Sequence, residues 1–522
     1  MVVLLLAAMA FAMVTTAVDQ TPTIDEPVYI TAATVYLREH SVRFNPEHPP
    51  LGKLAMAAGL AFAHPRLDQA FPVPAHASYG ARQRLTSRHL MYESGNDPGR
   101  LLLAARLPVI VLTVLFGLVV FAFARDLTGS AGGLVALALY AFSPDLIAHG
   151  ALATLDVAAA GFVLTAFWLL WRSRDRPLPY LPLAGMALGA ALATRANTLV
   201  ALPVVVALVV WHGRRNPWRA VARAGGVALV AVAVVWLAYL AVDPRLRWAA
   251  PAGVPALHGL RAIAVDLLPF PPSYRDGVRL QFAIDARGAD TFLFGHHYHG
   301  PVWYYLPAAM LVKTPLGMLA LWVAAAVVLL AVRRFRPAAA YLLLPAAVLF
   351  AVVAASNRDY GTRYAVFVPM FGAVAAATLI TLRWRWTGAV VAALVLSVAV
   401  SSARTFPYYL PYSNEAFGGP SRTHLRLHDS NVDWGQDLGR LAEVLRERYP
   451  GQTVWLSYKG SGVPAYYGIR SSNPLRVSAD RVHGLLVVSD SAVDLAEGPL
   501  KALIDSSVPI DEVGHSITIF RR

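Results

Sequence analysis

The sequence predicts a polytopic α-helical membrane protein with a small α/β domain at its C-terminal end. Of its 522 residues, 57% are hydrophobic and 15% are charged, and the mean hydropathy is +0.51. Soluble domains contain about 25% charged residues, so this chain is unusually apolar. Many apolar runs also approach or exceed the roughly 17–25 residues that cross a bilayer. We therefore expect about eleven transmembrane helices.

The net charge of +14 is explained by the membrane rather than by nucleic acid. Much of the arginine lies in short clusters between apolar runs, for example over 172–176 and 214–223. The positive-inside rule accounts for such clusters, which mark cytoplasmic turns. The chain contains no cysteine, and this excludes a disulfide framework and thiolate metal sites.

The apolar runs can be placed one by one. Spans are expected at 1–18, 101–124, 131–147, a segment ending near Trp171, 179–193, 198–211, 224–242, 301–332, 339–355, 364–382 and 387–401. The first run lacks a basic leading region, so we interpret it as a span and not as a signal peptide. With the arginine clusters inside, the polar loops all face outward.

Two domains follow from this layout. Residues 1–402 are expected to form the transmembrane catalytic domain, with outer loops at 19–100 and 243–300. Residues 403–522 are expected to form an extracytoplasmic α/β domain, because 432–449 has helical apolar spacing and 452–458 alternates like a strand. HGLLVVSDS and HSITIFRR supply two more candidate strands.

The first outer loop concentrates polar residues that could carry chemistry. Asp25 and Glu26 begin an expected helix over 24–40, and His48-Pro-Pro-Leu-Gly-Lys53 leads into another over 51–63. Adjacent helical residues point about 100° apart, so only one of the two carboxylates is expected to face a cavity. The acids could instead mark the end of a span, and Lys53 could snorkel to the interface rather than hold an anionic headgroup.

Further candidates lie at the outer ends of later spans. Asp156 stands in an alanine-rich apolar run, where an acid is costly unless it faces water or a partner. Arg195 and Arg363 could face the same cavity, and Tyr364 follows Arg363 directly. His149 lies seven residues before Asp156, but for this histidine we favour a buried side chain bonded to a carbonyl.

The second outer loop contains FGHHYHGPVWYY, with His296, His297 and His299. Three closely spaced histidines suggest a metal, but no acid lies at a good ligand spacing. We therefore predict no metal site here and expect an aromatic interface belt, or a lid over a sugar.

Several motifs together resemble the GT-C superfamily of polyprenyl-phosphate-sugar-dependent glycosyltransferases, in its branch of protein O-mannosyltransferases and aminoarabinose transferases. The motifs are DEPVY (25–29), HPPLGK (48–53), LATLD (152–156), VKTP (312–315), GTRY (361–364) and DSNVDWGQDL (429–438). The resemblance extends over nearly the whole chain. The tail does not resemble the β-trefoil of eukaryotic O-mannosyltransferases, so a protein acceptor is not implied.

The resemblance implies an inverting transfer of a sugar, with an oxocarbenium-like transition state, from a polyprenyl phosphate to an acceptor hydroxyl on the outer face of a bacterial plasma membrane. It implies Asp25 as the base, with Glu26 and Asp156 as further catalytic residues. The implied ligands of the donor phosphate are Lys53, Arg195 and Arg363, and the implied substrate contacts are His48, His149, Tyr29 and Tyr364.

The expected partners are the bilayer, the lipid-linked sugar and an acceptor that is a protein, a glycan or a lipid. No cofactor is implied beyond the donor, and a divalent metal is left open. The alternative function is a transporter or flippase for a lipid-linked sugar. It is less favoured, because the chain shows neither paired repeats nor charges at mid-membrane.

Overall fold

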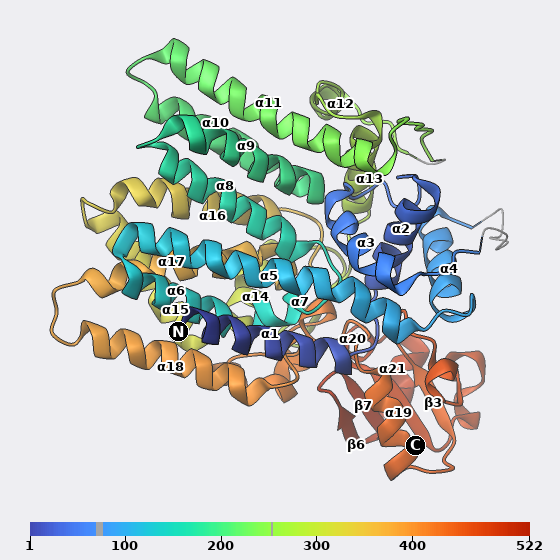
Figure 1. The fold of residues 1–522 in the computed structure, drawn as a ribbon. Helices are drawn as coiled ribbons and strands as arrows, with labels where there is room; N and C mark the ends of the chain where they lie inside the picture. Colours follow the sequence, from blue (N-terminus) through green and yellow to red (C-terminus); the bar gives the residue numbers. More distant parts are fainter. Residues whose placement is uncertain (69–76, 252–253) are drawn as a thin grey trace.

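The computed structural model describes residues 1–68, 77–251 and 254–522. Long helices lie side by side in a tilted bundle, and shorter elements gather at one of its ends (Figure 1). The bundle consists of α1 (Val2–Asp19), α5 (Pro98–Thr128), α6 (Ser130–Ala141), α7 (Pro144–Gly150), α8 (Asp156–Ser173), α9 (Pro177–Thr194), α10 (Ala201–His212), α11 (Pro217–Val242), α14 (Tyr305–Lys313), α15 (Leu316–Ala331), α16 (Arg336–Ala354), α17 (Phe367–Ala376) and α18 (Thr387–Thr405). A short 3-10 segment, Ala196–Val200, connects α9 to α10. A second one, Ala377–Thr381, continues α17.

Proline sets the start of many of these helices. α5, α7, α9 and α11 each begin at a proline. Proline suits this position, because the first N–H groups of a helix have no partner within the helix.

The chain is a multi-pass membrane protein, but its spans are less regular than expected. Among the described residues, six helices are long and apolar enough to cross a bilayer, or eight if two bent pairs each count as one. Not all of the roughly eleven expected spans meet this criterion of length and hydropathy. Several expected spans are short apolar helices, such as α10 and α17 with their 3-10 extensions.

Two expected spans are broken. The run at 131–147 forms α6 and α7, which meet at 62°, and the run at 301–332 forms α14 and α15, which meet at 118°. Each second helix begins at or just after a proline, Pro144 or Pro315. Thr314 is extended at ψ 129° because a residue before proline is disfavoured in the helical region.

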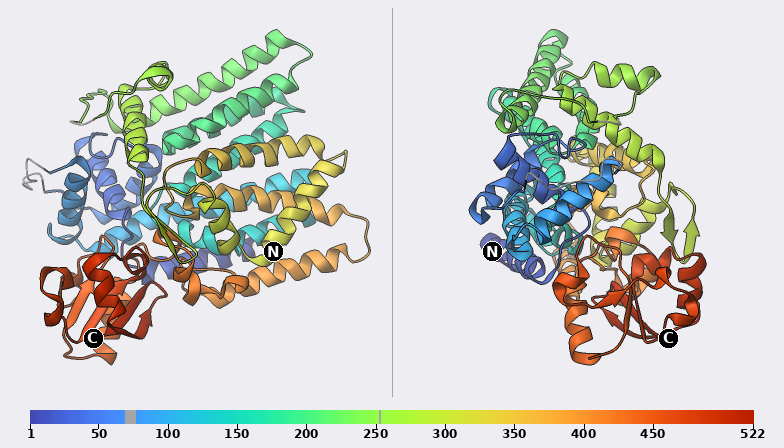
Figure 2. Two further views of the ribbon diagram at one scale, coloured as in Figure 1. Left: turned by 180° about the vertical axis from the view of Figure 1, so that it is seen from behind. Right: turned by 90° about the vertical axis from the view of Figure 1, so that its right-hand side faces the viewer.

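The outer elements cover one end of the bundle (Figures 1 and 2). They are α2 (Glu26–Glu39), α3 (Leu51–Ala63), α4 (Tyr79–Tyr92), α12 (Gly259–Asp266), α13 (Pro272–Arg287), the hairpin of β1 (Thr291–Leu293) and β2 (His296–Tyr298), and the C-terminal domain. The turns that carry the arginine clusters lie at the opposite end of the bundle (Figure 1). This separation agrees with the positive-inside pattern of the sequence.

The C-terminal domain has a five-stranded mixed sheet in the order β4-β3-β5-β7-β6. Its elements are α19 (Leu438–Arg448), β3 (Val454–Ser457), β4 (Ser471–Ser472), β5 (Leu485–Ser489), α20 (Asp490–Asp494), α21 (Gly498–Asp505), β6 (Val508–Val513) and β7 (Ile517–Arg521). β3 is parallel to β4 and β5, whereas β7 is antiparallel to β5 and β6. The apolar face of α19 packs on this sheet through Leu438, Leu441 and Leu445. The helix and three strands predicted from sequence are confirmed, and β4 and β6 are additional.

The segment before α19 returns to the first outer loop. The Thr21 N–H donates to the Gln436 carbonyl (2.9 Å), and the Ile24 N–H donates to the Trp434 carbonyl (3.0 Å). These bonds attach the start of the C-terminal domain to the stretch that precedes α2.

α9 and α11 pack closely because α9 presents glycines one turn apart. A Cβ added at Gly185 would lie 2.8 Å from the Val227 carbonyl oxygen, and one at Gly189 would lie 2.7 Å from that of Ala231. Small residues at this spacing let helix backbones approach each other in membranes.

We expect Gly189→Ala to destabilise the protein by about 1–3 kcal/mol, because the new methyl group meets backbone rather than a flexible side chain. The matched control is Gly226→Ala on the exposed side of α11, where a Cβ meets nothing within 4 Å. That change should leave stability unchanged or raise it by about 0.5–1 kcal/mol through helix propensity. Thermal unfolding of the detergent-purified protein measures both, and equal melting temperatures would contradict the packing account.

Candidate active site

Asp25 and Arg363 form the first contact of the site. Asp25 precedes α2, and its Oδ2 accepts a hydrogen bond from a terminal guanidinium nitrogen of Arg363 at 2.7 Å. Arg363 lies in a 3-10 turn (Thr362–Ala365) and is 8% exposed, whereas Asp25 is 30% exposed. The acid of the first outer loop therefore meets an arginine 338 positions later in the sequence.

A second carboxylate–arginine pair lies beside the first. Arg195, at the end of α9, forms an ion pair with Asp156 at the start of α8. The Tyr364 ring is close to both cations, with the guanidinium carbons of Arg195 and Arg363 each 4.9 Å from its centroid. Cations at this distance from an aromatic face are attracted by its quadrupole.

Trp434 packs against Arg363. Its ring lies 4.2 Å from the guanidinium carbon of Arg363, and the residue is 1% exposed. Trp434 reaches this place through its backbone bond to Ile24, described above. The C-terminal segment therefore completes a site that is otherwise built by the membrane domain.

A small cavity of about 50 Å³ connects this polar cluster to apolar side chains. Its polar lining includes Asp156, Arg195, Arg363 and Tyr364. Its apolar lining includes Val163 of α8, Leu349, Val352 and Val353 of α16, and Phe367 of α17. A lining that combines two cations with hydrocarbon suits an amphiphile with an anionic head.

Arg363 also has unused hydrogen-bonding capacity. Its Nε is buried and has no hydrogen-bond partner among the described residues. A buried unpaired donor costs about 1–3 kcal/mol, more when it is charged. An anion in the cavity would remove this cost.

Glu26, expected as a catalytic residue, has a structural role instead. It is fully buried, and its two carboxylate oxygens accept from Nε and a terminal nitrogen of Arg106, each at 2.7 Å. It also accepts from Thr23 (2.9 Å) and from the Ala153 N–H (2.8 Å). Burial favours the neutral acid, but Arg106 and these hydrogen bonds hold the pKa of Glu26 below its usual value. The carboxylate is saturated and is not available to a substrate.

Lys53, expected to bind the donor phosphate, is likewise saturated. Its Nζ donates to the Asn45 carbonyl (2.6 Å), the Asn45 side-chain oxygen (2.9 Å) and the His48 carbonyl (2.7 Å). An ammonium group has three N–H donors, so none is left for a phosphate. Lys53 is fully buried and stabilises the loop that leads into α3.

The four predicted substrate contacts divide between the site and the core. Tyr364 lines the cavity, and Tyr29 follows Asp25 by one helical turn. The His48 ring packs edge-on against Tyr29 with centroids 5.7 Å apart. Burial and the surrounding cations lower the pKa of His48 well below its usual value, so this imidazole is neutral near pH 7. His149 is fully buried in α7 and does not line the cavity, and its ring packs edge-on against that of Trp434 with centroids 6.4 Å apart.

Comparison with known proteins bears on the fold of the chain. Residues 99–239 match the family described as dolichyl-phosphate-mannose-protein mannosyltransferase. The crystal structure of ArnT from Cupriavidus metallidurans bound to undecaprenyl phosphate superposes with a TM-score of 0.52 and 14% identity, covering 99% of this chain and 97% of that one. AglB from Archaeoglobus fulgidus, in complex with an inhibitory peptide and a dolichol-phosphate, gives a TM-score of 0.50 and 14% identity over 97% of this chain and 72% of that one. No curated protein sequence matches the chain.

The chain shares the GT-C fold of these structures. The expected fold class, a GT-C membrane domain with a small C-terminal α/β domain, is therefore confirmed. The expectation of a membrane protein with a mannosyltransferase-like sequence agrees with the family match and with the fold.

Sequence reasoning missed three residues of this GT-C site. Arg106 was hidden inside an apolar span, where its charge could have been the signal. Trp434 lies in the quoted motif DSNVDWGQDL, but its distance from Arg363 in the sequence gave no indication of contact. Arg358 donates to the Gln281 side-chain oxygen (2.7 Å) and carbonyl (2.6 Å), which connects the outer turn before Arg363 to α13.

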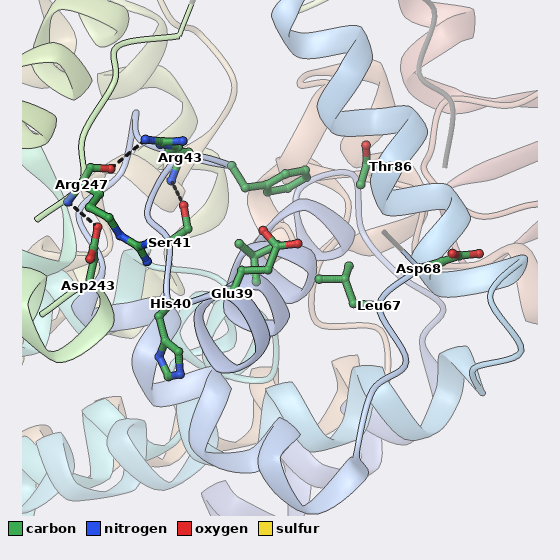
Figure 3. A pocket seen from close by; sticks show the side chains of 11 residues that line it. Glu39, His40, Ser41, Arg43, Leu67, Asp68, Thr86, Asp243 and Arg247 are labelled. Carbon is green, nitrogen blue, oxygen red and sulfur yellow. Dashed lines mark hydrogen bonds between the residues drawn. The ribbon is translucent and has the colours of Figure 1, made fainter. Parts of the chain in front are cut away.

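A larger cavity of about 510 Å³ lies at the other end of α2 and is not part of this site (Figure 3). Glu39, His40 and Arg43 line it near the end of α2, and Asp243 and Arg247 line it from the second outer loop (Figure 3). None of the predicted site residues lines it. A helix of this length spans about 20 Å, which separates this cavity from Asp25.

We expect Glu26→Gln to destabilise the protein by about 3–5 kcal/mol, because Arg106 is then left as an uncompensated buried charge. The control is Glu39→Gln at the exposed end of the same helix, which should change stability little. The unfolding temperature in detergent separates the two variants. An unchanged melting temperature for Glu26→Gln, together with lost activity, would instead indicate a catalytic role.

Proposed function

We propose that this protein is an inverting glycosyltransferase that moves a sugar from a polyprenyl phosphate to an acceptor hydroxyl on the outer face of the membrane. The observation that carries the proposal is the small cavity lined both by Arg195, Arg363 and Tyr364 and by apolar side chains. The solved relatives described above were crystallised with polyprenyl phosphates, which are amphiphiles of this kind.

In this proposal the two arginines hold the donor phosphate. Negative charge develops on the phosphate as its bond to the anomeric carbon breaks, and fixed cations stabilise that charge most when water is excluded. Arg363 contributes its unpaired Nε, and Arg195 contributes a guanidinium that Asp156 orients. Because the cavity measures about 50 Å³, donor entry requires the side chains of α16 and α17 to move apart.

Asp25 is the base of the proposed reaction. It accepts the proton of the acceptor hydroxyl while that oxygen attacks the anomeric carbon from the face opposite the phosphate. The C–O bond to the phosphate breaks, and the polyprenyl phosphate leaves with the electron pair. Asp25 is partly exposed, so an acceptor can reach it from water, whereas the buried Glu26 cannot be reached.

Orientation and acceptor complete the proposal. The arginine-rich turns lie at the end of the bundle away from the site, and by the positive-inside rule this supports our proposal of an extracytoplasmic site in a bacterial plasma membrane. The acceptor is a hydroxyl compound that enters from water beside Asp25. The transferred sugar is a hexose or a pentose, and the assay below includes donors of both kinds.

We expect Asp25→Asn to reduce the transfer rate by about 10²–10⁴-fold, which is the usual contribution of a general base. Donor binding should persist, because the amide removes the base without removing the cations. The assay incubates the purified chain with radiolabelled polyprenyl-phosphate sugars and follows transfer to acceptor extracts.

The matched control is Asp19→Asn, an exposed acid shortly before Asp25, which should retain full transfer. Wild-type rates in Asp25→Asn would remove the base from the mechanism. Movement of the lipid across liposomes without any transfer would favour the flippase alternative.

We expect Arg195→Gln and Arg363→Gln each to weaken binding of a short-chain polyprenyl phosphate roughly ten- to hundred-fold, as charge-assisted hydrogen bonds contribute about 1.5–3 kcal/mol. Arg470→Gln, at an exposed arginine of the C-terminal domain, is the control. Titration calorimetry in detergent gives the affinities. Equal affinities in all three variants would place the phosphate elsewhere.

A further inference from the structure

The β1–β2 hairpin of the second outer loop brings an acid next to the histidines that the sequence separated from it. The antiparallel register pairs Thr291 with Tyr298 and Phe292 with His297. Continuing that register by one residue sets Asp290 opposite His299. Cross-strand partners share a face and alternate residues share a face, so Asp290, His297 and His299 lie on the same side of the hairpin.

The potential ligand atoms of these three residues converge. Oδ2 of Asp290 lies 3.6 Å from Nε2 of His297 and 3.8 Å from Nδ1 of His299. One ligand atom from each residue lies within 4.8 Å of the other two. Ligands bound tetrahedrally at 2.0–2.2 Å from zinc are roughly 3.3–3.6 Å apart, so only a small contraction is needed. We predicted no metal site from the sequence because no acid lies at a suitable spacing along the chain. Strand pairing supplies that acid, Asp290, from the opposite strand.

A carboxylate from the C-terminal domain lies on the other side of the histidine ring. Oε1 of Glu497, just before α21, is 3.0 Å from Nδ1 of His297. This contact assigns the proton of His297 to Nδ1 and leaves Nε2 with a free lone pair. Nε2 is buried and has no hydrogen-bond partner among the described residues. Histidines that bind metals usually donate their other ring N–H to a carboxylate in this way.

We propose that Asp290, His297 and His299 bind a divalent transition-metal ion, with zinc the best match to a donor set of two imidazoles and one carboxylate. The fourth position is left for water. Glu497 holds His297 in the tautomer that binds the metal, and in doing so it joins the hairpin to the C-terminal domain. None of these four residues lines the arginine cavity, so the metal would not contact the proposed donor.

The metal would stabilise the support of the active-site turn. Thr291 of the hairpin donates to Oδ2 of Asp359 (3.0 Å), and the Val302 N–H donates to the same atom (2.6 Å). Asp359 lies four residues before Arg363 on the outer turn. A metal bound to the hairpin therefore restrains the loop that positions this arginine, without contacting the substrate.

The test uses the full chain, purified in detergent without a polyhistidine tag, stripped with EDTA and titrated with ZnCl₂ by calorimetry. We expect one zinc per chain, and a loss of affinity of at least 100-fold in Asp290→Asn and His297→Ala. Glu497→Gln should lose about 10–100-fold, the usual effect of removing an outer partner. His296→Ala, on the opposite face of the same strand, should bind like the wild type.

Thermal unfolding provides a second readout that does not depend on activity. Zinc should raise the melting temperature of the wild type and of His296→Ala, but not that of His297→Ala. Asp290 is 51% exposed, so we expect Asp290→Asn to fold normally. This variant therefore tests the metal site even if a histidine variant fails to fold. Absence of zinc binding in the wild type, or binding that is unchanged in Asp290→Asn, would overturn the proposal.

Discussion

The buried ion pair between Glu26 and Arg106 is the interaction on which the site depends. Arg106 also donates to the carbonyls of Ala17 (2.7 Å) and Gln20 (2.9 Å), and Glu26 accepts from the N–H of Ala153. One saturated network thus connects the end of α1, the start of α2, the span α5 and the connection before α8. Because Asp25 adjoins Glu26 and Asp156 follows Ala153 by three residues, the same network brings both acids of the site together. Breaking such a pair is costly, since it leaves one charge buried and uncompensated.

In the cavity lined by Arg195 and Arg363, each cation is already paired with a carboxylate in the absence of a ligand. Arg363 is paired with Asp25 and Arg195 with Asp156. These ion pairs offset part of the desolvation cost of burying the two guanidinium groups. Under the proposed function, a donor phosphate competes with these carboxylates for the guanidinium groups. Binding of the donor would then release Asp25 from Arg363 and free it to accept a proton. The base becomes available when there is a sugar to transfer.

The sequence predicted the class of protein, the polar positions and the end of the bundle to which they belong, but it did not predict the partners of several of these residues. Helical geometry indicated that only one of Asp25 and Glu26 would face a cavity, and it did not say which, because that depends on Arg106 in another helix. Lys53 was expected to bind phosphate, but its acceptors come from an irregular loop, Asn45 to His48, whose path has no periodic signal. The histidines of the second outer loop have no acid at a suitable spacing in the sequence, but the hairpin brings Asp290 close to two of them.

What the sequence determined by itself is local or compositional. The lengths of apolar runs, the positions of prolines and the sidedness of arginine clusters each act within a few residues or through the bilayer, so the expected α3 and the face of α19 that packs on the sheet are observed as predicted. Only the tertiary structure decided which charges are saturated and which remain available. Saturation depends on partners that are distant in the chain, such as Arg106 for Glu26, Arg363 for Asp25 and Glu497 for His297. Hydrogen bonds and ion pairs are short-range and directional, and only the packed fold brings such partners within reach.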